Sequence, residues 1–416
     1  MIKTPKSLRM HIGIFGRTNV GKSSFLNLVA GQDVAIISPE PGTTTDVVEK
    51  TMELLPVGPV VFLDTAGVDD RSKLAEQRIQ KSHKIFDRSD VILLIVEPGS
   101  WSGFEEEILA EAKQRALPAI IIINKIDLKV PSEEFLAKIK GITAKVILTS
   151  SLDQSTRERT LKELKKYLAD ITLVQSFEPP PLVADLLTPG GLIVLVVPID
   201  LEAPKGRLIL PQVQTIRDAL DSDAMALVVK EREYAAALVN LKKPPDLAVC
   251  DSQVVLKMVA DTPKTIKCTT FSILFSRSRG DLVEAARGVS AVKRLKPGDK
   301  VLIAEACSHH PVEDDIARVK LPRWLRQYVG GDLRIDVSAG QDYPENLREY
   351  KLIIHCGGCM INKRQMLSRI QLAREQGVAI TNYGLCISFL HGVIERVLEP
   401  FPAALEAYKI ENKNIT

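Results

Sequence analysis

Two cysteines stand close together in the segment LIIHCGGC, where Cys356 and Cys359 follow an apolar run and His355. Two thiolates do not complete a metal site, and a C-x-x-C pair can also act as a redox pair. An earlier segment, DKVLIAEACSHHP, ends in Cys307 and His309, which residues 310–354 separate from His355. The chain therefore offers a C-x-H group and an H-C-x-x-C group from which one metal centre could be assembled.

The two groups are expected to meet, because each follows a predicted strand of a parallel sheet. Open α/β sheets bind ligands in the crevice at the carboxyl ends of their strands. Gly357 and Gly358 would let the backbone turn tightly around a metal. The predicted ligands are Cys307, Cys356 and Cys359, and the candidates for a fourth position are Glu305, His309 and His355.

The residue types leave the metal itself open. Three cysteines with a histidine suffice for a closed, tetrahedral zinc site, which the residue types alone favour. Three thiolates with a weaker fourth ligand also describe a [4Fe–4S] cluster with an exchangeable position. His309 and His355 could instead be hydrogen-bonding partners of the ligands, and Glu305 could be solvated or salt-bridged.

The segment HIGIFGRTNVGKSS carries a Walker A pattern between an apolar strand and the helical SFLNLVAG. Its glycines let backbone N–H groups wrap phosphates, whose charge the helix N-terminus favours. Lys22 is predicted to reach the β- and γ-phosphates, and the Ser23 hydroxyl to bind Mg²⁺. The predicted phosphate-binding residues are Gly16, Asn19, Val20, Gly21, Lys22, Ser23 and Ser24.

The strand AIIIINKID identifies the nucleotide as a guanine nucleotide, because it ends in Asn124, Lys125 and Asp127. A carboxylate at Asp127 can accept hydrogen bonds from both N1–H and the exocyclic amine of guanine, a donor pair that adenine lacks. The segment LTSS places Ser150 and Ser151 where GTPases make a backbone contact to the base. GTP and GDP are therefore the predicted ligands.

The segments VVFLDTAG and PGTTTD supply the parts that would act on the γ-phosphate. Asp64 can hold Mg²⁺ through water, and the Gly67 N–H can meet the γ-phosphate. Thr44, or failing that Thr43, is the predicted switch residue that closes over Mg²⁺ and is released after hydrolysis. The predicted catalytic set is Lys22, Thr44, Asp64 and Gly67.

GTP hydrolysis is expected to need another electrostatic group or to be slow, because Val68 occupies the position after D-x-x-G where signalling GTPases carry a water-orienting glutamine. The motifs GRTNVGKS, PGTTTD, DTAG and NKID resemble those of the Era and tRNA-modification GTPases. Some of these bind K⁺ beside the phosphates with an asparagine where Asn19 stands. The resemblance thus implies that Asn19 is a K⁺ ligand, with a solvated loop amide as the alternative.

Length and composition describe a soluble, multidomain protein. With 416 residues, two to four domains are expected, and a net charge of +3 gives no case for nucleic-acid binding. No membrane span or export signal is indicated, so we expect a reducing, cytoplasmic compartment in which paired cysteines bind metal more often than they form disulfides. Cys250, Cys268 and Cys386 are expected to be packing residues.

Strand–helix alternation continues beyond the GTPase motifs. The charged segment 155–170 predicts the last helix of the first domain, and a proline-rich linker follows it. From Leu192 to Ala260 the alternation predicts a small parallel sheet that carries no nucleotide, metal or catalytic signature, which suggests an assembly surface. The predicted fold is α/β with three domains, each a mainly parallel sheet with helices on its faces, at residues 1–172, 173–265 and 266–416.

The whole arrangement resembles the [FeFe]-hydrogenase maturation GTPases of the HydF family, on the GTPase motifs together with Cys307, His309, His355, Cys356 and Cys359. The resemblance implies a P-loop GTPase domain, a homodimerisation domain and a [4Fe–4S] cluster domain in that order. It also implies a scaffold or carrier that assembles the diiron precursor of the hydrogenase active site. Radical-SAM maturases would supply this precursor, and the apo-hydrogenase would receive it.

Two other functions fit parts of the sequence. A regulatory GTPase with a structural zinc domain could act in RNA or ribosome assembly, although the last domain shows no basic–aromatic patches and only 5% of residues are aromatic. A GTP-dependent enzyme with a catalytic C-x-x-C would need a substrate pocket that the sequence does not indicate.

Overall fold

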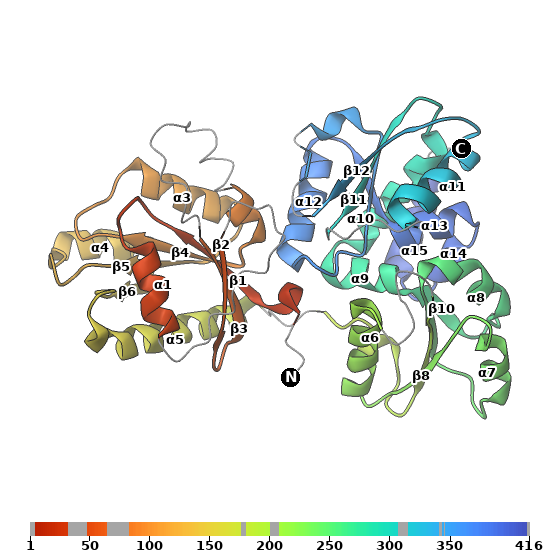
Figure 1. The fold of residues 1–416 in the computed structure, drawn as a ribbon, viewed down its shortest axis with the longest axis horizontal. Coiled ribbons are helices and arrows are strands. Elements are labelled where there is room, and N and C mark those ends of the chain that lie inside the picture. The colour runs from red at the N-terminus through yellow and green to blue at the C-terminus, as the bar shows by residue number, and fades with distance from the viewer. Residues whose placement is uncertain are drawn as a thin grey trace. The chain divides into compact units, whose positions relative to one another are not determined.

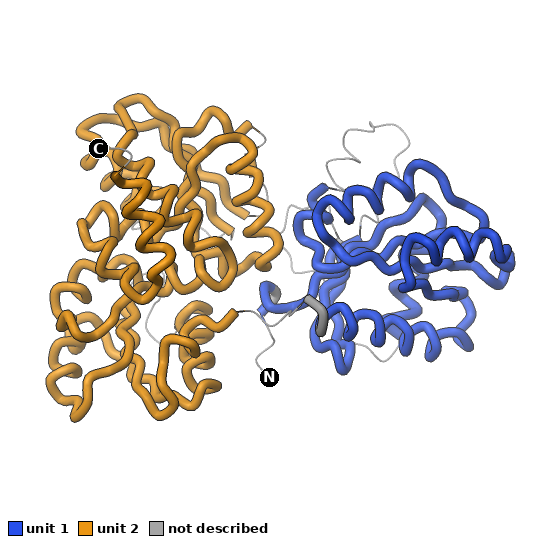
Figure 2. Tube along the Cα trace, turned by 180° about the vertical axis from the view of Figure 1, so that it is seen from behind, with its two compact units in different colours: residues 1–178 blue, residues 179–416 orange. Residues whose placement is uncertain are grey.

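The computed structural model describes residues 5–31, 48–64, 83–175, 180–199, 208–306, 315–340, 343–344 and 346–413. The chain forms two compact units, residues 1–178 and 179–416, which Figure 2 colours separately. The first unit holds one sheet and the second holds two (Figure 1). The predicted α/β class with three parallel-sheet regions is confirmed.

The first unit is built on a six-stranded sheet in the order β2-β3-β1-β4-β5-β6, in which only the β2–β3 pair is antiparallel. Its strands are β1 (Met10–Phe15), β2 (Val48–Leu54), β3 (Gly58–Asp64), β4 (Val91–Val96), β5 (Ala119–Ile123) and β6 (Val146–Leu148). Its helices are α1 (Lys22–Ala30), α3 (Gly103–Gln114), α4 (Glu133–Ile142) and α5 (Arg157–Gln175), and residues 83–88 are also helical.

The apolar strands of this sheet are covered on both faces. In β4 the residues Val91, Leu93 and Ile95 belong to one core, and the alternate residues Ile92, Leu94 and Val96 belong to another. Successive strand side chains point to opposite faces, so a continuous apolar run serves two cores at once. The charged segment predicted to close the domain forms α5, and its Leu164, Leu168 and Ile171 pack into the first of these cores.

The second unit begins with a parallel sheet in the order β10-β9-β7-β8. Its strands are β7 (Leu192–Val196), β8 (Met225–Val229), β9 (Leu247–Cys250) and β10 (Lys267–Thr270). Its helices are α6 (Leu210–Asp221), α7 (Tyr234–Asn240), α8 (Val255–Asp261) and α9 (Phe271–Arg279). The strands and helices predicted from Leu192 onward are present, and β10 extends the sheet to residue 270.

The last sheet is also parallel, in the order β12-β11-β13-β14. Its strands are β11 (Lys300–Glu305), β12 (Arg334–Ala339), β13 (Leu352–His355) and β14 (Ala379–Asn382). Its helices are α10 (Leu282–Gly288), α11 (Leu321–Val329), α12 (Lys363–Glu375), α13 (Tyr383–Leu390), α14 (Ile394–Leu398) and α15 (Pro402–Lys413).

The two sheets of the second unit repeat one winding pattern, because in each the first strand in sequence lies between the second and the third. They also share a core that runs from Val194 through Phe275 and Leu385 to Ile354. Cys250, Cys268 and Cys386 lie fully buried in this core, as packing residues would.

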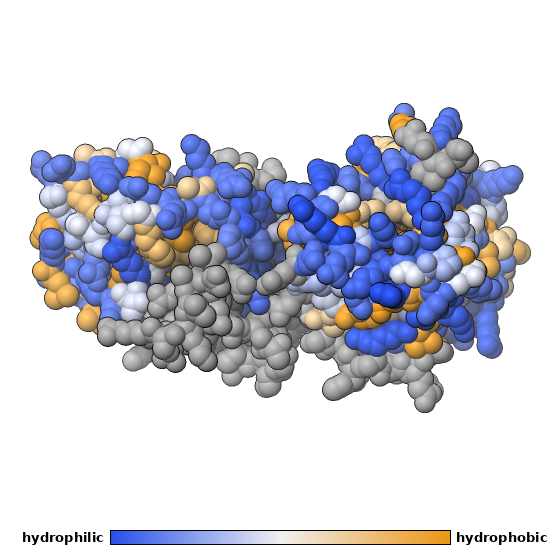
Figure 3. Space-filling view, turned by 90° about the horizontal axis from the view of Figure 1, so that it is seen from above, coloured by the Kyte–Doolittle hydropathy of each residue, from blue (hydrophilic) through white to orange (hydrophobic). Residues whose placement is uncertain are grey.

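Hydrophilic side chains cover most of the described surface in Figure 3, with apolar residues between them. Among the helices that the structure describes, none is both long and apolar enough to cross a membrane.

Candidate functional site

The Walker A loop joins β1 to α1 in the first unit. Gly16 and Gly21 adopt φ values of +151° and +92°, in the region that favours glycine. A Cβ would meet the Ile95 carbonyl oxygen at 2.5 Å from Gly16 and the Asn124 Nδ2 at 2.3 Å from Gly21. Both glycines are therefore required by left-handed backbone and by close neighbours, as the Walker A pattern predicts.

Two lysines hold the loop. Lys22 opens α1, and its Nζ donates hydrogen bonds to the carbonyls of Gly16 at 3.1 Å and Arg17 at 2.9 Å. The Lys125 Nζ donates to the Asn19 carbonyl and pairs with Glu97. Asn19 has φ +66° and an exposed side chain, so the loop presents its amide to solvent.

Asn124 connects the loop to the segment after β6. It is 1% exposed, its Nδ2 donates to the Val20 carbonyl at 2.8 Å, and its Oδ1 accepts from the Ser151 N–H at 2.9 Å. The Ser151 hydroxyl donates to the same oxygen at 2.8 Å. These bonds satisfy the buried amide and bring three sequence motifs to one edge of the sheet.

The remaining predicted residues follow the same strand ends. Asp64 ends β3 and is 1% exposed, whereas Ser23 and Asp127 are exposed to solvent. Ser150 is buried beside Ser151. Thr43, Thr44, Gly67 and Val68 lie outside the described residues.

An ion pair that the sequence motifs do not indicate fixes the start of the loop. The Arg17 guanidinium donates to both carboxylate oxygens of Glu105, from Nε at 2.7 Å and from Nη2 at 2.9 Å. Glu105 is 1% exposed and also accepts from the Ser102 N–H at 2.8 Å in a capping box that begins α3. Burial raises the pKa of Glu105, but the hydrogen bonds from Arg17 and Ser102 outweigh it and leave that pKa below its ordinary value.

The candidate metal centre lies in the second unit, where β11 and β13 are adjacent parallel strands with Ala304 opposite His355. The chain winds from β11 to β12 on one side and places β13 on the other side, so the winding direction reverses between β11 and β13. This reversal opens the crevice in which such sheets bind ligands. Cys356 directly follows β13, and in the sequence Cys307 comes two residues after the end of β11.

The Cys356 sulfur lies between backbone donors. Its Sγ accepts N–H hydrogen bonds from Ala306 at 3.1 Å and from Gly358 at 3.4 Å. Burial raises the pKa of Cys356 to about 11 and also raises the pKa of Cys359. A reactive C-x-x-C pair instead lowers a thiol pKa. The two backbone N–H donors would suit a thiolate that is bound to a metal.

His355 is oriented by bonds to both of its ring nitrogens. Nδ1 lies 2.9 Å from the Cys356 carbonyl, which can only accept, so Nδ1 carries the proton. Nε2 then accepts from the Arg369 Nη1 at 2.8 Å. Burial and the Arg369 charge lower the pKa of His355 to about 3, so the ring is neutral. Metal ligation through Nε2 would require the bond to Arg369 to break.

Glu305, the other described candidate for a fourth ligand, is held in an ion pair. Its Oε2 accepts from the Arg318 Nη1 at 2.9 Å, and the Glu305 side chain is 6% exposed. The same Nη1 lies 3.5 Å from Asp315. The salt-bridged role predicted for Glu305 is present among the described residues, and its role as a fourth ligand stays a prediction.

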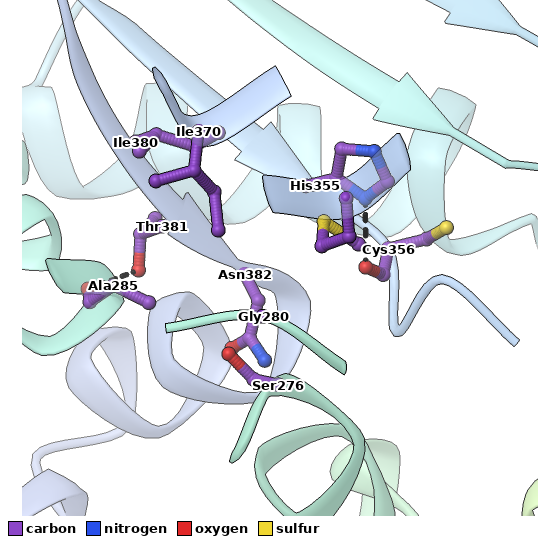
Figure 4. Close-up of a pocket in the computed structure, with 10 residues that line it drawn as sticks. Ser276, Gly280, Ala285, His355, Cys356, Ile370, Ile380, Thr381 and Asn382 are labelled. Atoms are coloured by element: carbon purple, nitrogen blue, oxygen red, sulfur yellow. Dashed lines mark hydrogen bonds between the residues drawn. The ribbon is translucent and has the colours of Figure 1, made fainter. Parts of the chain in front are cut away.

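A cavity of about 20 Å³ adjoins this crevice. Figure 4 shows it between His355 and Cys356 on one side and Ile380, Thr381 and Asn382 of β14 on the other. That volume accommodates a single water-sized group. No cluster of three or more His, Cys, Asp or Glu side chains able to hold a metal occurs within the described ranges. Those ranges omit Cys307 and His309.

Family models match residues in each of the three sheets. Residues 11–125 match the family described as the 50S ribosome-binding GTPase. Residues 182–280 match the hydrogen maturase F dimerization domain, and residues 283–400 match the hydrogen maturase F tetramerization domain. The chain belongs to the HydF family. The first HydF model spans β7 to α9 and the second spans β11 to β14.

Individual relatives resemble the GTPase part of this HydF chain. The tRNA modification GTPase MnmE of Cyanothece sp. is 40% identical over 121 residues, which are 29% of this chain and 26% of that protein. GTPase Der of Persephonella marina is 32% identical over 176 residues, 39% of each chain. The chain thus spans about a quarter to two fifths of the length of these curated relatives.

Among solved structures, the G domain of the T. maritima FeoB iron transporter is 22% identical to this chain. That similarity covers 39% of this chain and 99% of the G domain, with a TM-score of 0.30.

The sequence motifs did not indicate three charged residues near the two sites, namely Glu105, Arg279 and Arg369. Ser102-x-x-Glu105 is recognisable as a capping box, but nothing in the sequence joins it to Arg17. Arg279 and Arg369 stand on ordinary helices at no motif position, and only packing brings them to the C-x-x-C segment.

Proposed function

We propose that this chain is a GTP-hydrolysing scaffold or carrier in hydrogenase maturation. It binds a [4Fe–4S] cluster through Cys307, Cys356 and Cys359, and it assembles the diiron precursor of the [FeFe]-hydrogenase active site or delivers it to the apo-hydrogenase. Radical-SAM maturases, which supply that precursor, are the further partners. In this proposal the protein acts in the cytoplasm.

One observation carries the cluster assignment. The Cys356 Sγ lies 3.1 Å from the backbone nitrogen of Ala306, the residue that precedes Cys307. The two halves of the predicted ligand set therefore leave adjacent strands at the same end of the sheet, in a chain that matches two HydF models. Since Nε2 of His355 is engaged by Arg369 and Glu305 by Arg318, His309 is the candidate fourth ligand that we retain.

The nucleotide assignment rests on the loop geometry of the first unit. Lys22 and Ser23 open α1, and Asn124 ties the loop to Ser151. Ser23 and Thr44 would hold Mg²⁺ near Asp64, and Asp127 would select guanine. Hydrolysis is slow because of Val68, and K⁺ at Asn19 accelerates it. Turnover then biases the switch loops and, through them, partner binding.

Self-association is the role we assign to the sheet that the dimerization model matches. Its strand β8 lies at the sheet edge, with Met225 56% exposed and Val228 42% exposed. An exposed apolar edge strand is suited to pairing with another chain. A homodimer through this sheet is therefore part of the proposal, and the tetramerization model suggests that larger assemblies form.

The deciding measurement is the iron, sulfide and zinc content of protein purified and reconstituted without oxygen, with an EPR spectrum after reduction. About four irons per chain and a reduced-cluster signal are expected. Cys356→Ser should lose most of the iron and keep GTP hydrolysis, whereas the matched control Cys268→Ala should keep both. One zinc per chain with no iron would contradict the proposal and favour the regulatory GTPase with a structural zinc domain.

The GTPase half is tested separately by comparing hydrolysis in KCl and NaCl. The wild-type rate should be severalfold higher in KCl, and Asn19→Ala should abolish this difference while leaving GDP binding in place. Equal wild-type rates in the two salts would refute the K⁺ site and leave the cluster proposal untouched.

A further inference from the structure

Arg279 brings a buried positive charge to the C-x-x-C segment. It is the last residue of α9 and is 4% exposed. Its Nη1 donates to the Ile361 carbonyl at 3.1 Å and lies 3.5 Å from the Cys359 carbonyl. Its Nη2 donates to the Gln214 Oε1 of α6 at 3.0 Å. The guanidinium thus ties the chain that leaves Cys359 to a helix of the neighbouring sheet.

All these partners are neutral. Within the part of the chain that the structure describes, no carboxylate forms an ion pair with Arg279, and its other neighbour is the Phe275 ring at 5.1 Å. Burying a charge without a counter-ion is costly, so its retention calls for a nearby negative group. Cys359, whose carbonyl oxygen lies 3.5 Å from Nη1, is a predicted metal ligand, and a metal-bound thiolate at this residue would supply a negative charge.

A second arginine on the same helix shows the ordinary arrangement. Arg277 pairs with the Asp185 carboxylate and lies over the Phe401 ring at 5.3 Å. Its charge is already balanced by that carboxylate, whose side chain is 42% exposed. The contrast isolates what is unusual about Arg279, namely a buried charge whose hydrogen-bond partners are all neutral oxygens.

We propose that Arg279 is a positioning residue for the metal centre, which fixes the Cys359 and Ile361 carbonyls and provides the permanent positive charge beside a metal-bound Cys359 thiolate. The proposal rests on the proposed function in requiring a metal–thiolate group at this cysteine. A fixed positive charge stabilises the more negative, reduced form of such a group, so it should raise the reduction potential. The carbonyl contacts should slow the loss of metal.

The test uses the full chain, reconstituted with iron and sulfide without oxygen, as wild type and as the variants Arg279→Gln, Arg279→Lys and Arg277→Gln. Two quantities are measured: the rate of iron loss to a chelator, and the midpoint potential from an EPR-monitored redox titration. Arg279→Gln should lose iron about tenfold faster. Its reduced-to-oxidised ratio at a fixed potential should fall about tenfold, which is a shift of about 59 mV for one electron.

The other variants separate charge from packing. Arg279→Lys keeps the charge and should restore the potential, while Arg277→Gln should match the wild type in both quantities. An Arg279→Gln protein that behaves like Arg277→Gln would overturn this inference and leave the cluster proposal standing. A wild-type chain that takes up no iron would overturn both. If circular dichroism shows that Arg279→Gln does not fold, Arg279→Met, which can pack on Phe275 without a polar group, takes its place.

Discussion

His355 and Arg369 form a buried pair in which the imidazole Nε2 accepts a hydrogen bond from the guanidinium Nη1 at 2.8 Å. The same guanidinium donates to the Gly340 carbonyl at 3.0 Å and lies over the Tyr343 ring at 4.9 Å. Arg369 thereby joins the segment after β12 to the end of β13. We therefore expect His355 to orient the Cys356 backbone and not to bind metal.

His355→Gln should therefore keep the iron content of the reconstituted protein close to that of wild type. It should also lower the free energy of unfolding by about 1–3 kcal/mol, because glutamine has no N–H at the place of Nδ1 and the Cys356 carbonyl loses its donor. Iron analysis and urea denaturation measure the two effects, with Cys356→Ser as the variant that loses iron. Loss of most of the iron from His355→Gln would show that the histidine is a ligand after all.

The two glycines of the C-x-x-C segment should respond differently to alanine. Gly358 has φ +67°, and a Cβ there would lie 2.4 Å from the Met366 Cε, whereas a Cβ at Gly357 would lie 3.7 Å from Phe275. Gly358→Ala should cost about 1–2 kcal/mol in the free energy of unfolding, because left-handed backbone disfavours a Cβ. Gly357→Ala, the control, should change it by less than about 0.5 kcal/mol. Urea unfolding curves that coincide for the two variants would refute this difference.

Glu105→Gln should weaken nucleotide binding, although Glu105 lies outside the recognised GTPase motifs. It removes the charge that holds Arg17 at the start of the Walker A loop, and a charge-assisted hydrogen bond is worth about 1.5–3 kcal/mol. We expect a fluorescent GDP analogue to bind about three- to tenfold more weakly, since part of that energy positions the loop. Glu106→Gln is the matched control. The neighbouring Glu106 is exposed, and its carboxylate lies 3.7 Å from the Lys138 ammonium and not beside Arg17. Equal affinities in the two variants would mean that Glu105 only caps α3.

Acid should destabilise the first unit through His11 of β1. Burial and then the Arg88 charge lower the pKa of His11 to about 4. Between about pH 6.5 and pH 4 the unfolded state binds a proton at His11 that the folded state does not bind. The free energy of unfolding therefore keeps its full value above about pH 6.5 and decreases as the pH falls towards 4. Between pH 7 and pH 5 the loss should be about 2 kcal/mol.

Hydrogen exchange of the β1 amides in the full chain measures this loss. His11→Gln should flatten the pH dependence of their protection, while His83→Gln, on an exposed side chain, should leave it as in wild type. An unchanged slope in His11→Gln would assign the acid sensitivity to other groups.

The local patterns of the sequence were sufficient for the strands and helices, and the ligand positions that they indicate stay predictions. Apolar runs such as those of β4 and β13 predict buried parallel strands, because both faces of each strand are covered. Gly16 and Gly21 follow from the conformations that a phosphate-binding loop needs. The ligand positions are predicted at strand ends because in a parallel sheet the carboxyl ends of the strands all lie at one edge.

Tertiary structure alone decided which charges surround those positions. Arg17 meets Glu105 across 88 positions of sequence, Arg279 meets Ile361 across 82, and Arg369 meets His355 from a helix that follows it. The sharing of one core by two sheets was likewise invisible in the sequence. A hydrophobic pattern specifies which face of an element is buried, but it does not specify the partner. The free-energy cost of burying a guanidinium depends on the groups that surround it, and only the tertiary structure determines those groups.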